Sequence, residues 1–107
     1  MAEPTLQQVF GTNASQDATT ITITKADLTG LTASGSNTAE SLITAIILKA
    51  SSYLNSTNQG TNTDIQITIE DSNFPQVVTR NNAQYRQTTY NVNFQSADNY
   101  TLDPDNF

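Results

Sequence analysis

The 107-residue sequence contains no cysteine, no histidine and no tryptophan. Without cysteine there is no disulfide, no thiolate ligand for zinc and no thiol nucleophile. Without histidine the chain lacks the commonest general base, the Ser-His-Asp triad and the imidazole ligands of most transition-metal sites. An enzyme built from these residues would have to act through Asp, Glu, Tyr, Lys or Arg. We therefore expect a protein that is not an enzyme and that holds no metal and no cofactor.

Basic residues are scarce. Lys25, Lys49, Arg80 and Arg86 face ten acidic side chains, and the net charge is −6. Nucleic-acid binding depends on clustered Lys and Arg, and anionic membranes attract basic segments, so the sequence predicts neither partner. The longest apolar run, LITAIILKA, is far shorter than the roughly 20 residues of a membrane span. The N-terminal stretch MAEPTLQQVFG has no basic region followed by an apolar one, which predicts no secretory signal peptide.

Neutral polar residues dominate what is present. Nearly half of the 107 residues are Thr, Asn, Gln or Ser, while charged residues make up only 13%. Such side chains suit sheets and loops that lie against other proteins, where a charge is costly to desolvate and a hydroxyl or amide can pair locally. A chain of this length buries one modest core, so we expect a single domain.

Two segments have helical patterns. Residues 3–10 predict a short helix ended by Gly11. The stronger pattern covers residues 38–55, where Asn37 is expected to cap the first turn and Glu40 to complete a capping box. The apolar stripe of this helix follows the i, i+3, i+4, i+7 spacing and consists of Leu42, Ile43, Ile46, Ile47, Ala50, Tyr53 and Leu54.

Strand patterns account for most of the remainder. Residues 19–24 alternate strictly, with Ile21 and Ile23 expected toward the core, and residues 64–70 place Ile65, Ile67 and Ile69 on one face. Residues 76–80 and 85–95 predict two further strands, joined by a hairpin connection at 81–84. Tyr85 falls on the opposite face from Tyr90, Val92 and Phe94, so a bulge is expected near residues 86–89.

These elements predict an α+β fold of the order β-α-β-β-β. One amphipathic helix would pack on a mainly antiparallel sheet of about four strands, leaving a face of Thr, Gln and Asn open to solvent or to a neighbour. Within the single domain 1–107 we expect an N-terminal arm or short helix over 1–18. The α+β core then covers 19–95, and a C-terminal arm covers 96–107.

Three clusters are candidate sites. Asp98, Asp103 and Asp105 could bind calcium, but the spacing of a calcium loop is absent, and a solvated acidic tail is the simpler interpretation. Glu70 and Asp71 are adjacent on a strand, so they point to opposite faces and are expected to end the strand and not to act as a catalytic pair. Arg80 and Arg86 flank Tyr85 and are expected on a surface or interface hairpin.

The aperiodic ends carry the residues most expected to meet a partner. Apolar side chains on a segment without helical or strand spacing need another surface to cover them, either another chain or the edge of the domain. Pro104 holds its part of the C-terminal arm extended, which lowers the cost of ordering it on binding. The predicted interface residues are Leu6, Val9, Phe10, Tyr85, Tyr100, Leu102 and Phe107.

Several stretches together resemble small virion proteins of tailed phages that infect cyanobacteria, and related proteins in cyanobacterial genomes. The resemblance covers most of the chain. It rests on the overall residue pattern of these stretches and their order, without a diagnostic motif. The stretches are AEPTLQQVFG, TTITITKADLTGLT, SNTAESLITAIILKA, NFPQVVTRNNAQYRQTTYNVNF and TLDPDNF.

The resemblance implies a virion structural protein, first of all a head decoration (cement) protein seated on the lattice of the major capsid protein. Proteins of this kind carry no cofactor and often act as homo-oligomers. Other virion components, namely tail-tube, neck and tail-terminator proteins, share the composition, and a stand-alone cytosolic binding module is the alternative outside the virion. The expected location is the virion, assembled in the host cytoplasm. No functional residues carry over from the family.

Overall fold

A computed structural model describes residues 2–96 and 102–107 of the chain. Within these ranges no helix is long and apolar enough to cross a membrane. The helices are α1 (Leu6–Phe10), α2 (Ala39–Ser51) and α3 (Ser56–Thr61), with short 3-10 helices η1 (Lys25–Asp27) and η2 (Pro104–Asn106). The strands are β1 (Ser15–Gln16), β2 (Ile21–Thr22), β3 (Ile67–Asp71), β4 (Gln76–Arg80), β5 (Ala83–Gln87) and β6 (Tyr90–Phe94).

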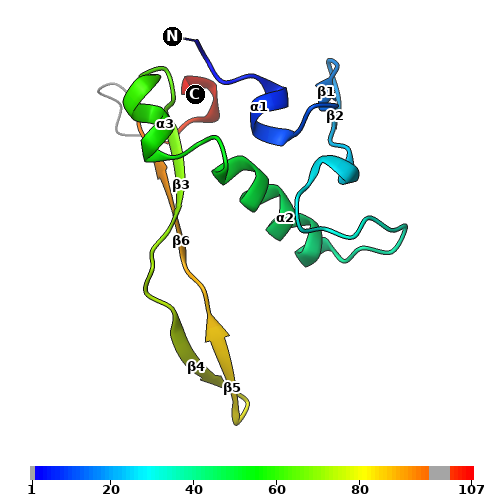
Figure 1. Cartoon of the computed structure of the whole chain (residues 1–107), viewed down its shortest axis with the longest axis vertical. Helices are drawn as coiled ribbons and strands as arrows, with labels where there is room; N and C mark the ends of the chain where they lie inside the picture. Colours follow the sequence, from blue (N-terminus) through cyan, green and yellow to red (C-terminus); the bar gives the residue numbers. More distant parts are fainter. Residues whose placement is uncertain (1, 97–101) are drawn as a thin grey trace.

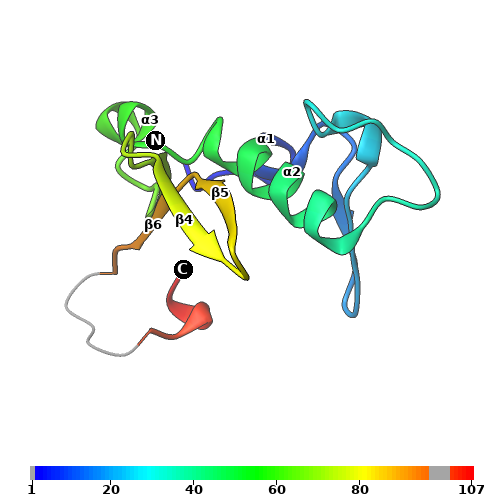
Figure 2. The ribbon, with the colours of Figure 1, turned by 90° about the horizontal axis from the view of Figure 1, so that it is seen from below.

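The α+β class and the antiparallel pairing are confirmed (Figure 1). The strands nevertheless pair in twos and do not join one sheet of four: β1 pairs with β2, β3 with β6, and β4 with β5. The last two pairs follow one another along a single long hairpin, because β4 and β5 lie between β3 and β6 in the chain. The hairpin extends away from α2. The ribbon of β1 and β2 lies on the opposite side of α2 from α3 and the hairpin (Figure 1, Figure 2).

Helix α2 begins one residue later than the sequence predicted. Its cap is Thr38, whose side-chain oxygen accepts a hydrogen bond from the Ser41 backbone N–H at 3.1 Å. Asn37, the expected cap, instead holds the preceding loop: it accepts from the Ser34 N–H at 2.9 Å and donates to the Thr32 carbonyl at 3.0 Å. Asn37 therefore stabilises the loop before α2 and does not cap the helix.

The helix predicted over 38–55 ends early, at Ser51, and a separate helix, α3, begins just beyond the predicted end. The hydroxyls of Ser51 and Ser52 donate to the carbonyls of Leu48 and Lys49, which offers the last turn of α2 an alternative to further helical bonds. Asn55 then caps α3, accepting from the Asn58 N–H at 2.9 Å. The chain therefore forms a second helix at Ser56–Thr61, where the sequence predicted none.

Helix α3 packs against β3, which corrects the expectation of an open polar sheet face at this position. The Ser56 hydroxyl donates to a Glu70 carboxylate oxygen at 2.9 Å, and Gln59 donates to the Ile65 carbonyl at 2.8 Å. Thr68, on the same face of β3 as Glu70, is buried. Its hydroxyl accepts from the Asn93 amide on β6 at 3.3 Å, so the buried hydroxyl is satisfied locally.

The long hairpin turns at Asn81 and Asn82. Both have positive φ, 52° and 63°, which is the conformation of a two-residue type I′ turn and one that Asn tolerates better than most residues. The hairpin connection predicted over 81–84 is therefore present but shorter, since β5 already begins at Ala83.

A register change divides the hairpin into two halves. On the body side of the change Asp71 pairs with Tyr90, and on the turn side Gln76 pairs with Gln87. The four residues 72–75 of one strand therefore face the two residues 88–89 of the other. The two extra residues lie in the stretch Ser72–Pro75, where Asn73 has a φ of 62°. The bulge was predicted near residues 86–89, but the extra residues lie on the opposite strand, in the stretch Ser72–Pro75.

The buried core is small and lies where α2 meets the base of the hairpin. Its buried cluster consists of Ala50, Leu54, Ile65 and Ile69, with Val9, Ile47, Tyr53, Ile67 and Tyr90 packed around it. The radius of gyration is 16.0 Å, against about 13 Å for a compact domain of this length. The principal extents of 48 × 35 × 25 Å show why: the hairpin projects out of the body.

Two parts of the predicted core lie outside it. Ile21, expected to point inward, is 53% exposed, because β1 and β2 form a small ribbon of their own and do not join a larger sheet. Ile43, expected on the buried stripe of the long helix, is 51% exposed. Ile43 stays exposed because no four-stranded sheet forms to bury it. Among the described elements, α1 and β3 make the extensive contacts with α2.

Candidate functional site

The structure brings four of the predicted interface residues together at the base of the hairpin. Val9 and Phe10 of α1 line one cavity of about 190 Å³ with Phe107, Leu54 and Ile67. Phe107 comes from the end of the chain and lies edge-to-face on Phe94, with ring centroids 5.8 Å apart. The terminal segment thus returns to the body, one of the two placements that the sequence predicted for it.

A second cavity of about 370 Å³ adjoins the first, because both are lined by Ile67 and Phe107. Its other lining residues are Phe94, Leu102 and Pro104, so its wall is almost entirely apolar. We call the two cavities together the basal groove. It is built from the N-terminal segment, the base of the hairpin and the C-terminal segment, three parts of the chain that only folding makes neighbours.

The other predicted interface residues lie elsewhere. Leu6 is half-buried on α1 and does not line the groove. Tyr85 lies on β5, near the far end of the hairpin, with the Arg80 guanidinium 4.3 Å from its ring centroid. The expected grouping of Arg80 and Tyr85 on a surface hairpin is therefore confirmed. Tyr100 lies outside the described residues.

The outer half of the hairpin, residues 72–89, forms what we call the hairpin arm. None of its residues is buried. Phe74 is 77% exposed and Val77 is 61% exposed, the highest and third-highest values among the exposed large apolar side chains. Val77 pairs directly with Arg86 across the ribbon, so an apolar and a cationic side chain share one face of the arm.

Sequence reasoning did not select Phe74 or Val77. Phe74 falls between two predicted strands, and Val77 falls in the strand predicted over 76–80, which was expected to join the sheet. The available signal was the Asn-Asn pair at 81–82 with apolar residues on both sides. That pattern predicts a hairpin but does not reveal whether the hairpin has a neighbour.

Charge is divided between the arm and the rest of the chain. The arm carries Arg80 and Arg86 and no acidic residue, a net charge of +2. The remaining residues hold all ten acidic side chains and two lysines, a net charge of −8, and the two parts make up the −6 of the whole chain. The arm is therefore a cationic, apolar projection on an acidic body.

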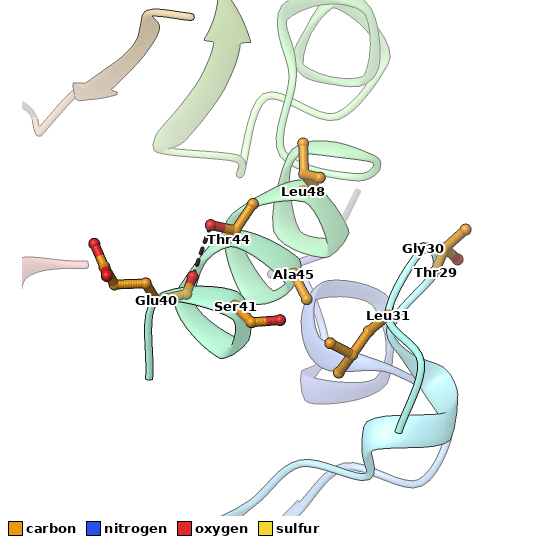
Figure 3. A pocket seen from close by; sticks show the side chains of 8 residues that line it. All are labelled: Thr29, Gly30, Leu31, Glu40, Ser41, Thr44, Ala45 and Leu48. Atoms are coloured by element: carbon orange, nitrogen blue, oxygen red, sulfur yellow. Dashed lines mark hydrogen bonds between the residues drawn. The ribbon is translucent and has the colours of Figure 1, made fainter. Parts of the chain in front are cut away.

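A further cavity of about 400 Å³ lies between the connector at residues 29–31 and one side of α2 (Figure 3). Ser41 and Ala45 point from the helix toward Leu31, whereas the Glu40 side chain points away from the connector. The Thr44 hydroxyl already donates to the Glu40 carbonyl at 2.7 Å. The cavity thus offers the hydroxyls of Ser41 and Thr29 beside apolar side chains, and these groups do not form an acid–base pair.

Two of the acidic candidate residues accept hydrogen bonds from nearby backbone N–H groups. Asp71 accepts from the Asn73 N–H at 2.9 Å, and Asp103 accepts from the Asp105 N–H at 3.0 Å. Among the residues that the structure describes, no group of three or more acidic side chains is arranged to hold a metal ion. Asp98 lies outside the described residues.

Asp17 shows the same use of a carboxylate in more detail. It accepts hydrogen bonds from the backbone N–H groups of Thr19 and Thr20, both at 2.8 Å, and from their hydroxyls. These bonds, those to the backbone first, lower the pKa of the Asp17 carboxyl below its ordinary value because they favour its charged form. The residue shapes the turn between β1 and β2.

Comparison with protein-family models, with curated proteins and with solved structures finds no match for this chain.

Proposed function

We propose that this chain is a non-enzymatic structural subunit that works through protein–protein contacts in a larger assembly. The hairpin arm carries the proposal: 18 residues project from the body, none is buried, and the most exposed large apolar side chain of the described residues lies on it. A strand pair exposed on both faces gains little from folding alone. Its apolar side chains gain their burial only against another protein.

The resemblance to small phage virion proteins names the assembly. On that basis we propose a virion, and within it the position of a decoration protein on the major capsid lattice. The neutral polar composition and the projecting arm support this position, because a cement subunit must contact several neighbours with a small body. A tail-tube, neck or tail-terminator position is the alternative within the same proposal.

The direct experiment is mass spectrometry of purified virions from a host that propagates the corresponding phage. Heads and tails are separated before digestion, and the chain is expected in the head fraction at a copy number that matches a repeated lattice site. Recovery only with tails would move the subunit to the tail. Absence from both fractions would contradict the virion assignment.

A binding experiment tests the role independently of the particle. Purified capsid lattice is mixed with the full chain and with a variant in which Phe74 and Val77 are both replaced by Ser, and bound protein is quantified after sedimentation. We expect the variant to remain folded and to lose most of its binding. A matched control replaces the exposed Ile43 and Leu48 on α2 by Ser and should bind as the original chain does.

A further inference from the structure

The separation of charge between arm and body indicates what the arm meets. A cationic, apolar projection on an acidic body is complementary to the body of an identical chain. We propose that the hairpin arm of one copy docks in the basal groove of a second copy. This inference deepens the proposed assembly role and rests on it: the arm joins one copy to the next, and joined copies hold the lattice through several weak contacts at once, so a variant without the arm loses lattice binding.

The groove matches the arm in chemistry. Its wall is apolar, and Glu3 lines its first cavity. Asp103 and Asp105 flank Pro104, which lines the second cavity, and both are exposed. The arm offers the reverse pattern, with Val77 beside Arg86 on one face and Arg80 stacked on Tyr85 on the other. Apolar contact in the middle and opposite charges at the rim is the usual arrangement of a specific interface.

The arm cannot fill the groove of its own chain. The groove is lined by Ile67 and Phe94, which pair at the base of the hairpin, whereas the turn lies at Asn81 and Asn82. From residue 67 to residue 80 the chain runs through β3, the stretch Ser72–Pro75 and β4, and an extended chain of that length spans at most roughly 40 Å. In the structure the hairpin leads away from its base (Figure 1), so the arm lies apart from the groove of its own chain and is free to meet a second copy.

The contact joins two different surfaces, an arm and a groove. Two copies can therefore exchange arms reciprocally and close as a dimer, or each copy can pass its arm to the next and close as a ring. Either arrangement leaves one arm and one groove per chain satisfied. It also covers Leu102 and Phe94, which are exposed in the single chain.

Sedimentation velocity of the full chain over a range of concentrations and at two salt concentrations tests the proposal. We expect self-association that weakens as salt rises, because the contact pairs opposite charges. Arg86→Glu should weaken the association roughly tenfold, since it turns an attraction at the rim into a repulsion. Lys49→Glu makes the same change in net charge on α2 and is the matched control, expected to leave the association unchanged.

A charge exchange identifies the groove as the partner. Glu3→Lys should weaken the association when tested alone, and mixing it with the Arg86→Glu chain should restore much of the original affinity. Circular dichroism of each variant confirms that it is folded. A chain that sediments as a monomer at every concentration, or equal losses from Arg86→Glu and Lys49→Glu, would overturn the proposal.

The outcome separates this inference from the proposed function. A chain found in virions that nevertheless stays monomeric and insensitive to Arg86→Glu contradicts the self-docking and leaves the virion role intact. A chain that associates through arm and groove but is absent from virions contradicts the virion role and supports the self-docking.

Discussion

The inner and outer halves of the long hairpin are built from the same kinds of residues but differ in what their side chains touch. In the inner half, Ile69 is buried against α2 and Thr68 is buried on the opposite face. In the outer half, Val77 has the same β-branched shape and the same strand geometry, yet it is 61% exposed. The alternation of residues along a strand thus predicts which face is apolar. Whether that face is buried within the same chain depends on the other elements packed against it.

The sharpest test of this contrast compares one buried with one exposed apolar residue. Ile65, only 1% exposed, is the largest fully buried side chain, and Ile65→Ala should lower the free energy of unfolding by about 2–5 kcal/mol. Val77→Ala should change it by less than about 0.5 kcal/mol. Urea unfolding measures both. Similar losses for the two variants would mean that the arm is part of the folded core.

The second largest loss of stability is expected from a substitution at Gly11, where the backbone conformation and a close neighbour both disfavour a side chain. Gly11 has a φ of 120°, and a Cβ at this position would lie 2.5 Å from the Asp27 Cβ. Asp27 in turn accepts two hydrogen bonds from Asn13 and cannot move freely. Gly11→Ala should cost about 1–3 kcal/mol of stability in thermal unfolding. Gly35→Ala has open space around it and is the control, expected to be nearly neutral.

A smaller effect is expected where the C-terminal segment joins the body. Phe107→Ala removes the edge-to-face contact with Phe94 and part of the groove wall, and should cost about 1–2 kcal/mol. Leu102→Ala, at an exposed position, should cost less than about 0.5 kcal/mol. A chain that lacks residues 97–107 belongs in the same unfolding series and should keep a folded core, since the buried cluster contains none of these residues. A null result for Phe107→Ala would place the segment outside the folded body.

The smallest effect concerns pH. Because the folded-state pKa of Asp17 is lowered, its contribution to stability is present above the ordinary pKa of the carboxyl and is lost as pH falls through the lowered one. The amide resonances of Thr19 and Thr20 should report this titration by NMR, while the distal hairpin arm, which has no acidic residue, should not respond. An Asp17→Asn variant should abolish the transition. Titration at the ordinary value would contradict the bonded turn.

Much of the local structure could be predicted from the residues. Spacing and turn chemistry predict the short helix before Gly11, the alternation of Ile65, Ile67 and Ile69, and the hairpin around Asn81 and Asn82. The structure contains each of them. These features depend on neighbours within a few residues, which the sequence displays directly.

The candidate site could be predicted only in part. Leu102 and Phe107 were selected because apolar residues on an aperiodic segment need cover, and Val9 and Phe10 because they lie on the predicted short N-terminal helix. All four line one groove. That the groove is completed by Ile67 and Phe94 depends on contacts between residues far apart in the chain. The exposure of Phe74 and Val77 was not predictable, because it arises from β4 and β5 pairing only with each other and not joining a larger sheet.

The sequence by itself determined the kind of protein: an acidic α+β chain without His or Cys, with its arginines confined to one hairpin and its apolar ends available for contact. Local spacing, turn residues and composition carry that information. Tertiary structure decided that the strands pair in twos, that the C-terminal segment returns to the body, and that the hairpin projects. These outcomes depend on competition among distant surfaces for burial, which no single stretch of the chain records.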